Sequence, residues 1–288
     1  MHLPKNYKLT VKNSLKEDIR KEDITTRLVI PKHLKGSAVI VPREKGILCG
    51  VSIAREVFYQ VDKSLAFYSF KKEGSAFNKG EKVVKISGKM RSIITAERVA
   101  LNFLSFLSGI STTTRQFVDK ISLIKTKIMD TRKTTPTLRA FEKYAVRVGG
   151  GYNHRSSLSD AILVKDNHLH TAKYFGDKKI DKEKFKKFIL LARKKTSLKI
   201  EVETETLSEF RQIIHYRPDV IMLDNFSLKG ILTAVKLRNE YFPTVLLEAS
   251  GGINLNNVLS VAKTGVDFIS VGKLTHSPRA IDFSLEIS

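Results

Sequence analysis

The sequence predicts an α/β protein in which a small N-terminal domain precedes a β/α barrel that is closed or nearly closed. Short β-rich runs separated by glycine, proline and charged turns fill residues 1–90, and such runs are typical of a small α/β or α+β domain. From residue 127 onward, apolar runs end in polar residues and are followed by segments of helix length. This alternation favours a parallel sheet whose outer face is covered by helices.

The N-terminal region contains three strand candidates and then a long helix. The strand candidates are "SAVIVPREKGILCG", "LAFYSF" and "EKVVKISG". Residues 95–122 predict a helix, because apolar side chains recur at helical spacing from Val99 to Ile110. Thr95 is suited to cap the N-terminus of this helix, and Arg98 lies on its polar stripe.

Six strand candidates follow, and each one ends in a polar tip. They are "KIMDTRK", "DAILVKDN", "LKIEVE", "DVIMLDN", "TVLLEASGG" and "DFISVGK". The last four tips, near Glu203, Asp224, Glu248 and Gly272, are 21, 24 and 24 residues apart, which is the length of compact βα units. Residues at the carboxyl ends of barrel strands share one mouth, so we expect these tips to lie close together.

The predicted mouth combines cations, carboxylates and glycines. These groups are Arg132, Lys133, His154, Arg155, Lys165, Glu203, Asp224, Gly251, Gly252 and Gly272. Arginine binds carboxylate and phosphate through paired hydrogen bonds. Two carboxylates can hold sugar hydroxyls or a hydrated magnesium ion, and glycine lets backbone N–H groups approach an anion closely. The set predicts a site for a phosphorylated sugar beside an acidic co-substrate.

The net charge of +22, from 51 basic and 29 acidic residues, attracts anions but does not select one. Nucleic acid, acidic membranes and small polyanionic substrates all fit such a field. The lysine-rich run at 177–188 indicates a solvated face of an amphipathic helix. Arg139, Lys143 and Arg147 are spaced by four, so we expect them to be surface or interface charge on a helix.

Several classes of protein are disfavoured by missing patterns. The sequence has no GxGxxG after a strand, no GxxxxGK[ST] and no HExxH. Its one cysteine leaves no disulfide framework. The longest apolar runs, such as "VIML", are short for a membrane span, and the N-terminus lacks the apolar core of a secretory signal. We therefore expect a cytoplasmic protein without a membrane partner, and no metal at His168 and His170, which lack a third ligand at fixed spacing.

Seven segments together resemble the quinolinate phosphoribosyltransferase family. They are "AERVALNFLSFLSGISTTTR", "DTRKTTPTLRAFEKYAVRVGGGYNHR", "LSDAILVKDNH", "IEVE", "MLDNF", "LEASGGIN" and "GVDFISVGKLTHS". The match is collinear from about residue 15 to the C-terminus. One departure is Thr137, which stands where family members commonly carry glycine.

The resemblance implies a fold and a reaction. The fold would be an open, incomplete β/α barrel with a smaller N-terminal α/β sandwich domain. Residues 1–112 would form the sandwich and a connecting helix, residues 113–270 the barrel, and residues 271–288 a segment that returns to the first domain. The reaction would convert quinolinate and phosphoribosyl pyrophosphate to nicotinate mononucleotide, pyrophosphate and carbon dioxide, with Mg2+, in de novo NAD biosynthesis.

The resemblance also implies roles for individual residues. Arg98 would reach into the site of a neighbouring subunit. Lys133, Glu203 and Asp224 would be catalytic, with the two acids at the ribose hydroxyls and at magnesium, directly or through water. Quinolinate would be bound by Arg98, Arg132, His154, Arg155 and Lys165. The ribose and phosphate groups would be bound by Lys133, Glu203, Asp224, Ser250, Gly251, Gly252, Gly272 and His276.

The implied assembly is a homodimer with shared active sites, or a higher oligomer, without nucleic acid. Two alternatives remain open from the sequence. One is a relative of the same fold associated with molybdenum transport genes, although "NHR" and "KDNH" fit the quinolinate enzyme better. The other is a basic nucleic-acid-binding protein, favoured by the net charge of +22 but lacking interleaved aromatic residues and any recognisable binding module.

Overall fold

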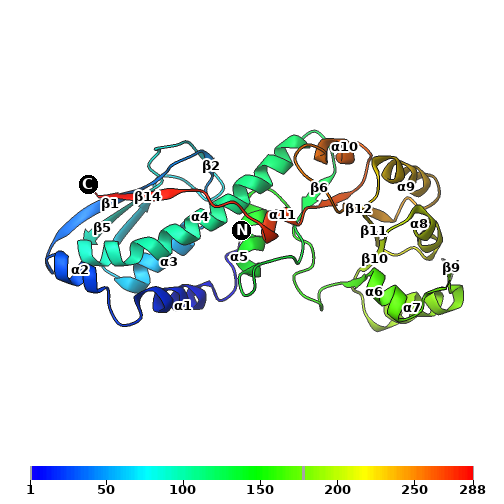
Figure 1. Cartoon of the computed structure of the whole chain (residues 1–288), viewed down its shortest axis with the longest axis horizontal. Helices are drawn as coiled ribbons and strands as arrows, with labels where there is room; N and C mark the ends of the chain where they lie inside the picture. Colours follow the sequence, from blue (N-terminus) through cyan, green and yellow to red (C-terminus); the bar gives the residue numbers. More distant parts are fainter. Residues whose placement is uncertain (1, 177–178, 288) are drawn as a thin grey trace. The chain divides into compact units, whose positions relative to one another are not determined.

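A computed structural model describes residues 2–176 and 179–287 and divides into two units (Figure 1). The first unit contains residues 1–115, 134–150 and 273–288, and the second contains residues 116–133 and 151–272. The expected boundaries after residues 112 and 270 lie within three residues of these divisions. The difference is the segment 134–150, which we expected in the barrel domain.

Hydrogen bonds explain why the segment 134–150 groups with the first unit. Its helix α5 (Arg139–Val148) accepts a bond from the Ser111 hydroxyl at the Ala145 carbonyl, at 2.7 Å. The Arg115 guanidinium donates to the carbonyl of Gly149 at 3.0 Å. Both donors lie on helix α4 (Met90–Lys120), which therefore holds the C-terminal part of α5.

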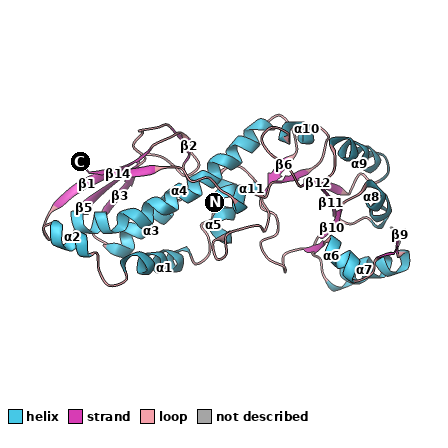
Figure 2. Ribbon diagram, in the orientation of Figure 1, coloured by secondary structure: helices cyan, strands magenta, loops and turns pink. Residues whose placement is uncertain are grey.

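Four strands of the first unit form an antiparallel sheet of order β14-β1-β5-β3 among the described residues, and β2 pairs separately with β4. The terminal strand β14 pairs with β1, so the end of the chain returns to the first unit. Helices and strands of this unit are distinguished in Figure 2. Their bounds are α1 Tyr7–Ile19, α2 Ile24–Val29, β1 Lys35–Pro42, β2 Gly46–Ile47, α3 Val51–Val61, β3 Ala66–Ser69, β4 Ala76–Phe77, β5 Val84–Lys89, α11 Lys273–His276 and β14 Phe283–Ile287.

Helix α4 begins at Met90, five residues before the predicted start. The prediction of Thr95 as N-cap is wrong: Thr95 lies inside the helix, and its hydroxyl donates to the Asp23 carboxylate at 3.0 Å. By length and composition α4 could cross a membrane, but 56% of its most apolar window is buried within the protein. A helix in the core of a folded domain has the same property, so the window does not identify a membrane protein.

In the second unit, the predicted parallel sheet is confirmed, with described strands in the order β6-β13-β12-β11-β10-β7. The first and last of these strands are not paired with each other in the described residues, as expected for an open, incomplete barrel. The strands are β6 Lys127–Met129, β7 Ile162–Val164, β10 Ile200–Thr204, β11 Val220–Asp224, β12 Leu246–Ser250 and β13 Phe268–Ser270. Side chains such as those of Val202, Ile221 and Leu247 are fully buried and form its core.

Helices cover the outside of this sheet, and Figure 1 shows α8 and α9 beside strands β10 to β12. They are α6 Asp166–Thr171, α7 Lys182–Lys195, α8 Leu207–Ile213, α9 Leu228–Tyr241 and α10 Val258–Ala262, with a short hairpin of β8 Phe175–Gly176 and β9 Lys179–Ile180 before α7. The predicted lysine-rich helix thus begins at Lys182, where the Asp181 carboxylate caps it by accepting from the Lys184 N–H. Residues 177 and 178 of that prediction lie outside the described residues.

Helix α5 corrects one prediction about charge. Lys143 was expected on a solvated or interface face with Arg139 and Arg147, but Lys143 is only 4% exposed. Most side chains of α5, including the fully buried Glu142, are enclosed by the protein. Arg147 is exposed as expected. Spacing by four identified one helix face, but it did not show that neighbouring structure covers that face.

Candidate active site

A pocket of about 330 Å³ lies in the second unit, at the carboxyl ends of the parallel strands. Its lining includes most of the predicted site residues, namely Arg132, Lys133, His154, Arg155, Lys165, Glu203, Asp224 and Ser250. The lining also includes residues that the sequence did not single out as ligands, namely Thr131, Leu163, Met222, Glu248 and Ser270.

Strand register explains why these residues meet. Glu203 at the end of β10 is paired with Met222 of β11, and Asp224 at the end of β11 is paired with Ser250 of β12. Each step across the parallel sheet therefore places another strand end at the same edge. Residues 131–133 reach this edge because they directly follow β6, whose Met129 is paired with Ser270 of β13.

Negative charge is concentrated around Glu203 and Asp224. The Glu203 side chain is 8% exposed and accepts a hydrogen bond from the Lys165 ammonium at 2.9 Å. Nearby, burial and then the negative charges of Asp166 and other neighbouring acids raise the pKa of Glu205. The neighbouring acids add to the effect of burial on Glu205, and a cation bound beside them would be stabilised.

Positive charge is concentrated around Arg132 and Arg155. Burial, followed by the neighbouring charge of Arg132, lowers the pKa of Arg155. The Arg155 guanidinium donates to the Ala161 carbonyl at 3.1 Å, while its buried Nε has no hydrogen-bond partner in the described structure. Two like charges and an unsatisfied buried donor favour an anionic ligand, because such a ligand would neutralise the charge and accept the bond.

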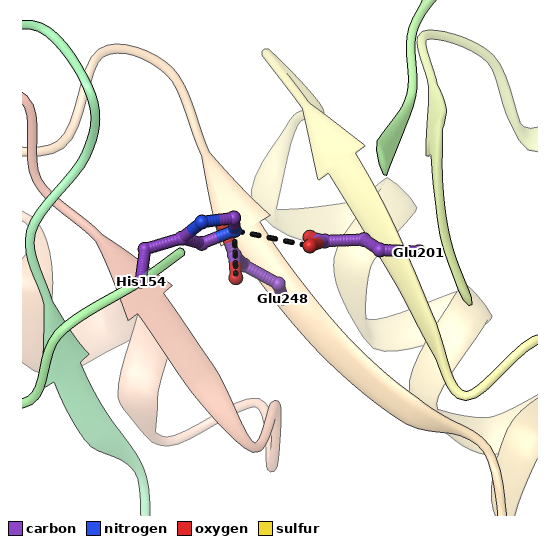
Figure 3. Close-up of side chains that lie close together, drawn as sticks. All are labelled: His154, Glu201 and Glu248. Atoms are coloured by element: carbon purple, nitrogen blue, oxygen red, sulfur yellow. Dashed lines mark hydrogen bonds and ion pairs between the residues drawn. The ribbon is translucent and has the colours of Figure 1, made fainter. Parts of the chain in front are cut away.

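A third cluster lies below these residues and joins His154 to two glutamates, Glu201 and Glu248. Figure 3 shows the imidazole directed toward both carboxyl groups. The His154 Nε2 lies 3.0 Å from Glu201 Oε2 and 3.7 Å from Glu248 Oε2. Glu201 is 6% exposed and Glu248 1% exposed. Burial, followed by the charge of Glu201, raises the pKa of Glu248 to about 8, so Glu248 is mostly protonated at neutral pH.

Sequence reasoning did not assign a role to Glu201, Glu248 or Asp130. A signal was present for Glu201, because side chains two apart on a strand share one face and Glu203 had been placed at the mouth. Asp130 is fully buried after β6, where its carboxylate accepts from the backbone N–H of His154 at 2.9 Å and from the Asn153 amide at 2.5 Å. In the sequence, Asp130 follows an apolar strand, and no local pattern distinguished it from an aspartate that caps a helix.

The predicted phosphate-binding glycines follow strand ends but do not line the pocket. Gly251 has a φ of +86°, and a Cβ there would lie 2.9 Å from the Asn225 backbone nitrogen, so only glycine fits without rearrangement. Gly252 has a φ of +63° with open space around it. Gly272 lies two residues after the end of β13 at Ser270. Their roles in phosphate binding stay predictions.

Two predicted site residues lie in the first unit. Arg98 is exposed on α4, and the exposed His276 ends α11, with its Nδ1 2.7 Å from the Ser277 hydroxyl. Neither lines the pocket, and their roles also stay predictions. His168, for which no metal was expected, accepts a hydrogen bond at Nδ1 from the Lys165 backbone N–H at 2.9 Å and caps α6.

Comparison with known proteins gives full-length matches. The profile described as quinolinate phosphoribosyl transferase, N-terminal domain, matches residues 23–108, and that of the C-terminal domain matches residues 110–286. The chain is 39% identical over 282 residues to the nicotinate-nucleotide pyrophosphorylase [carboxylating] of Mycobacterium leprae, covering 96% of each chain. It is 41% identical over 276 residues to a probable enzyme of the same name from Synechocystis, covering 95% of this chain and 90% of the relative.

A solved structure gives the same result for the fold. The nicotinate-nucleotide pyrophosphorylase of Francisella tularensis superposes with a TM-score of 0.89 at 40% identity, covering 100% of this chain and 98% of the other. The predicted fold class is therefore confirmed. At 40% identity over nearly the whole of both chains, this relative belongs to the same family.

Proposed function

Since the chain belongs to the quinolinate phosphoribosyltransferase family, we propose that its reaction takes place in the pocket at the strand ends. The enzyme is a nicotinate-nucleotide pyrophosphorylase (carboxylating) of NAD biosynthesis. It converts quinolinate and phosphoribosyl pyrophosphate to nicotinate mononucleotide, pyrophosphate and carbon dioxide. The observation that supports the location is one pocket in which Arg132, Lys133, Arg155 and Lys165 adjoin Glu203 and Asp224.

Quinolinate carries two carboxylates, and the basic side of the pocket is suited to a dianion. Arg132, Arg155 and Lys165 would bind these carboxylates beside His154. The lowered pKa of Arg155 and its unsatisfied Nε support this assignment. Each charge-assisted hydrogen bond in such a site contributes about 1.5 to 3 kcal/mol.

The acidic side of the pocket is suited to the ribose. Displacement of pyrophosphate from C1 builds positive charge on the sugar, which Glu203 and Asp224 would stabilise, while Lys133 would stabilise the negative charge of the leaving group. Ser250 and the backbone at Gly251, Gly252, Gly272 and His276 would bind phosphate groups.

Decarboxylation then needs no nucleophilic side chain. Once ribosylated, the ring nitrogen is cationic, and its charge stabilises the electron pair that stays on the adjacent ring carbon when the C–CO2 bond breaks. A proton then replaces the lost carboxylate on the ring. The role of the protein in this step is to hold the second carboxylate and the ring in place, which the same cations would do.

Magnesium fits the donor set on the acidic side. Mg2+ prefers carboxylate and water oxygens, and the mutual repulsion of acids around Glu205 would be relieved by a divalent cation. Glu203 and Asp224 would hold the ion directly or through water. When bound, the ion would neutralise charge on the pyrophosphate group.

The assembly we propose is a cytoplasmic homodimer, or a higher oligomer, with shared active sites. Arg98 would act on the pocket of the neighbouring subunit and bind quinolinate there. Its exposed position on α4, together with its absence from the pocket lining of its own chain, supports this assignment.

The activity is tested by incubating purified protein with carboxyl-labelled quinolinate, phosphoribosyl pyrophosphate and magnesium. We expect stoichiometric release of labelled carbon dioxide and nicotinate mononucleotide, and no release when any one component is omitted. A folded protein that forms no product would favour the relative associated with molybdenum transport. Sequence-selective nucleic-acid binding at physiological salt, measured by filter binding, would instead favour the nucleic-acid-binding alternative.

The shared site is tested by mixing Arg98→Ala and Glu203→Ala subunits, each inactive alone. Random exchange should restore about one quarter of the wild-type activity, since half of the dimers are mixed and each carries one intact site. Subunit exchange should first be demonstrated by mass spectrometry. If the exchanged mixture then recovers no activity, the assignment of Arg98 is contradicted. Mixing either variant with itself is the matched control.

A further inference from the structure

The loop that carries Asn153, His154 and Arg155 is held by buried acids that the proposed chemistry leaves without a task. Asp130 binds the backbone of His154 and the side chain of Asn153. Glu201, from β10, and Glu248, from β12, approach the His154 ring from the side of the sheet. Because acids are almost never fully buried without a partner or a purpose, this arrangement requires an explanation.

Both nitrogens of the His154 ring are occupied by protein. Its Nδ1 accepts the backbone N–H of Arg155 at 2.8 Å, so the proton of a neutral ring lies on Nε2. That N–H points to Glu201 Oε2 at 3.0 Å. The ring therefore connects the floor of the pocket to the backbone of Arg155, whose side chain lines the pocket.

We propose that Glu201 and Glu248 are positioning residues for quinolinate: they fix the His154 ring with its proton on Nε2, and the ring in turn fixes Arg155 for the substrate carboxylate. The inference rests on the proposed function, because quinolinate is the ligand whose binding is affected. Under this proposal, the main role of His154 is to hold Arg155 in position.

The positions of the two acids support this arrangement. Glu201 Oε2 is the nearer acceptor, at 3.0 Å from His154 Nε2, and Glu248 Oε2 lies 3.7 Å from the same atom. Both acids are buried, at 6% and 1% exposed, so the ring is enclosed on this side by protein rather than by water. Hydrogen bonds between a ring N–H and a carboxylate are the usual way in which proteins fix the tautomer and orientation of a histidine.

Kinetics of Glu201 variants test the proposal. Glu201→Leu should raise the KM for quinolinate and weaken its directly measured binding by about 10-fold to 100-fold, while the KM for phosphoribosyl pyrophosphate changes by less than about 3-fold. Glu201→Gln keeps an oxygen acceptor for the Nε2–H and should restore most of the quinolinate affinity. Glu248→Leu should resemble Glu201→Leu with a smaller effect, because Glu248 is farther from the ring at 3.7 Å.

A matched control separates positioning from general loss of stability. Phe210→Leu removes packing from a fully buried side chain of α8 in the same unit and should lower the melting temperature without changing the KM for quinolinate. Equal changes in both KM values for Glu201→Leu, or an unchanged KM for quinolinate, would overturn the proposal.

Nitrogen-15 NMR of the histidines gives a readout that is independent of turnover. In the wild type, the signals assigned by comparison with His154→Gln should show a protonated Nε2 and a bare Nδ1, and Glu201→Leu should shift the Nε2 signal, because the Nε2–H loses its carboxylate acceptor. A proton on Nδ1 in the wild type would overturn the proposal. If the protein formed no nicotinate mononucleotide, these spectra would still decide whether the acids fix the ring, so failure of the proposed function is distinguishable.

The same three side chains could instead hold a metal, since their ligand atoms lie within 4.8 Å of one another. Equilibrium dialysis against Mn2+ or Zn2+ tests this alternative in the substrate-free protein. We expect no stoichiometric binding that depends on Glu201 or Glu248. One bound ion per chain that is lost in both Glu201→Leu and Glu248→Leu would overturn the positioning proposal.

Discussion

Two pairs of carboxyl groups in the second unit differ in their partners and therefore in chemistry. The rim pair, Glu203 and Asp224, lines the pocket with Lys165 beside Glu203. The buried pair, Glu201 and Glu248, lies against His154. Glu201 and Glu203 are two residues apart on the same face of β10. Glu203 would contact the substrate, whereas Glu201 contacts the His154 ring. Glu201 and Glu203 are equally buried, at 6% and 7% exposed, so the neighbouring groups, rather than residue type or depth, assign the task.

Removing charge from the rim pair should give the largest effect. Glu203→Gln should lower kcat by about 100-fold to 1,000-fold, because stabilisation of developing charge is lost in the transition state. Binding of quinolinate in the absence of the second substrate should change little, and calorimetry measures it. A variant with near wild-type kcat would mean that the rim pair is not catalytic.

Removing Glu248 from the buried pair should change how stability depends on pH. The folded-state pKa of about 8 lies above the ordinary value of 4.5, so the folded state binds more protons than the unfolded state between these values. The free energy of unfolding should therefore fall as pH rises from about 4.5 to about 8. Glu248→Gln should flatten this slope, as measured by urea unfolding across the pH range.

Asp62, a carboxylate outside both pairs, should give stability the opposite dependence on pH. Asp62 accepts hydrogen bonds from Ser64 and Ser92, and chiefly the bond from the Ser64 hydroxyl lowers its pKa from 3.8 to about 2. Its stabilising contribution is present above pH 3.8 and is lost as pH falls through about 2. Asp62→Asn should cost about 1 to 2 kcal/mol at pH 7 and much less at pH 2. An equal cost at both pH values would contradict the linkage.

The smallest effect is expected for an exposed acid near the rim pair. Glu205→Gln removes one of the charges that surround Glu203 and Asp224, but solvent and salt screen it. The magnesium concentration for half-maximal activity should rise by about 2-fold to 3-fold, and the change should shrink at high salt. A change as large as that of Glu203→Gln would show that exposure does not separate the acids.

Patterns in the sequence predicted the strands and most of the pocket because both depend on short-range spacing. Every predicted barrel strand ends at the same edge in the structure, as the period of the parallel sheet requires. The departure noted at Thr137 lies where the backbone φ is +68°, in the left-handed region that favours glycine.

Predictions failed where the environment, rather than the spacing, decided the outcome. Lys143 shares a helix with an exposed arginine yet is 4% exposed, and Thr95 bonds to Asp23 from within a helix that starts at Met90. Both depend on segments distant in sequence that pack against the residue. No window of local sequence contains that information.

The sequence by itself determined the order of strands and helices, the family and the groups that meet at the strand ends, because periodicity and motifs are written locally. Only the tertiary structure decided which partner each acid meets. Glu201, Glu203 and Glu248 are the same residue type in one sheet, on β10 and β12, but their roles follow from the cations and acids that folding places within a few ångströms of each.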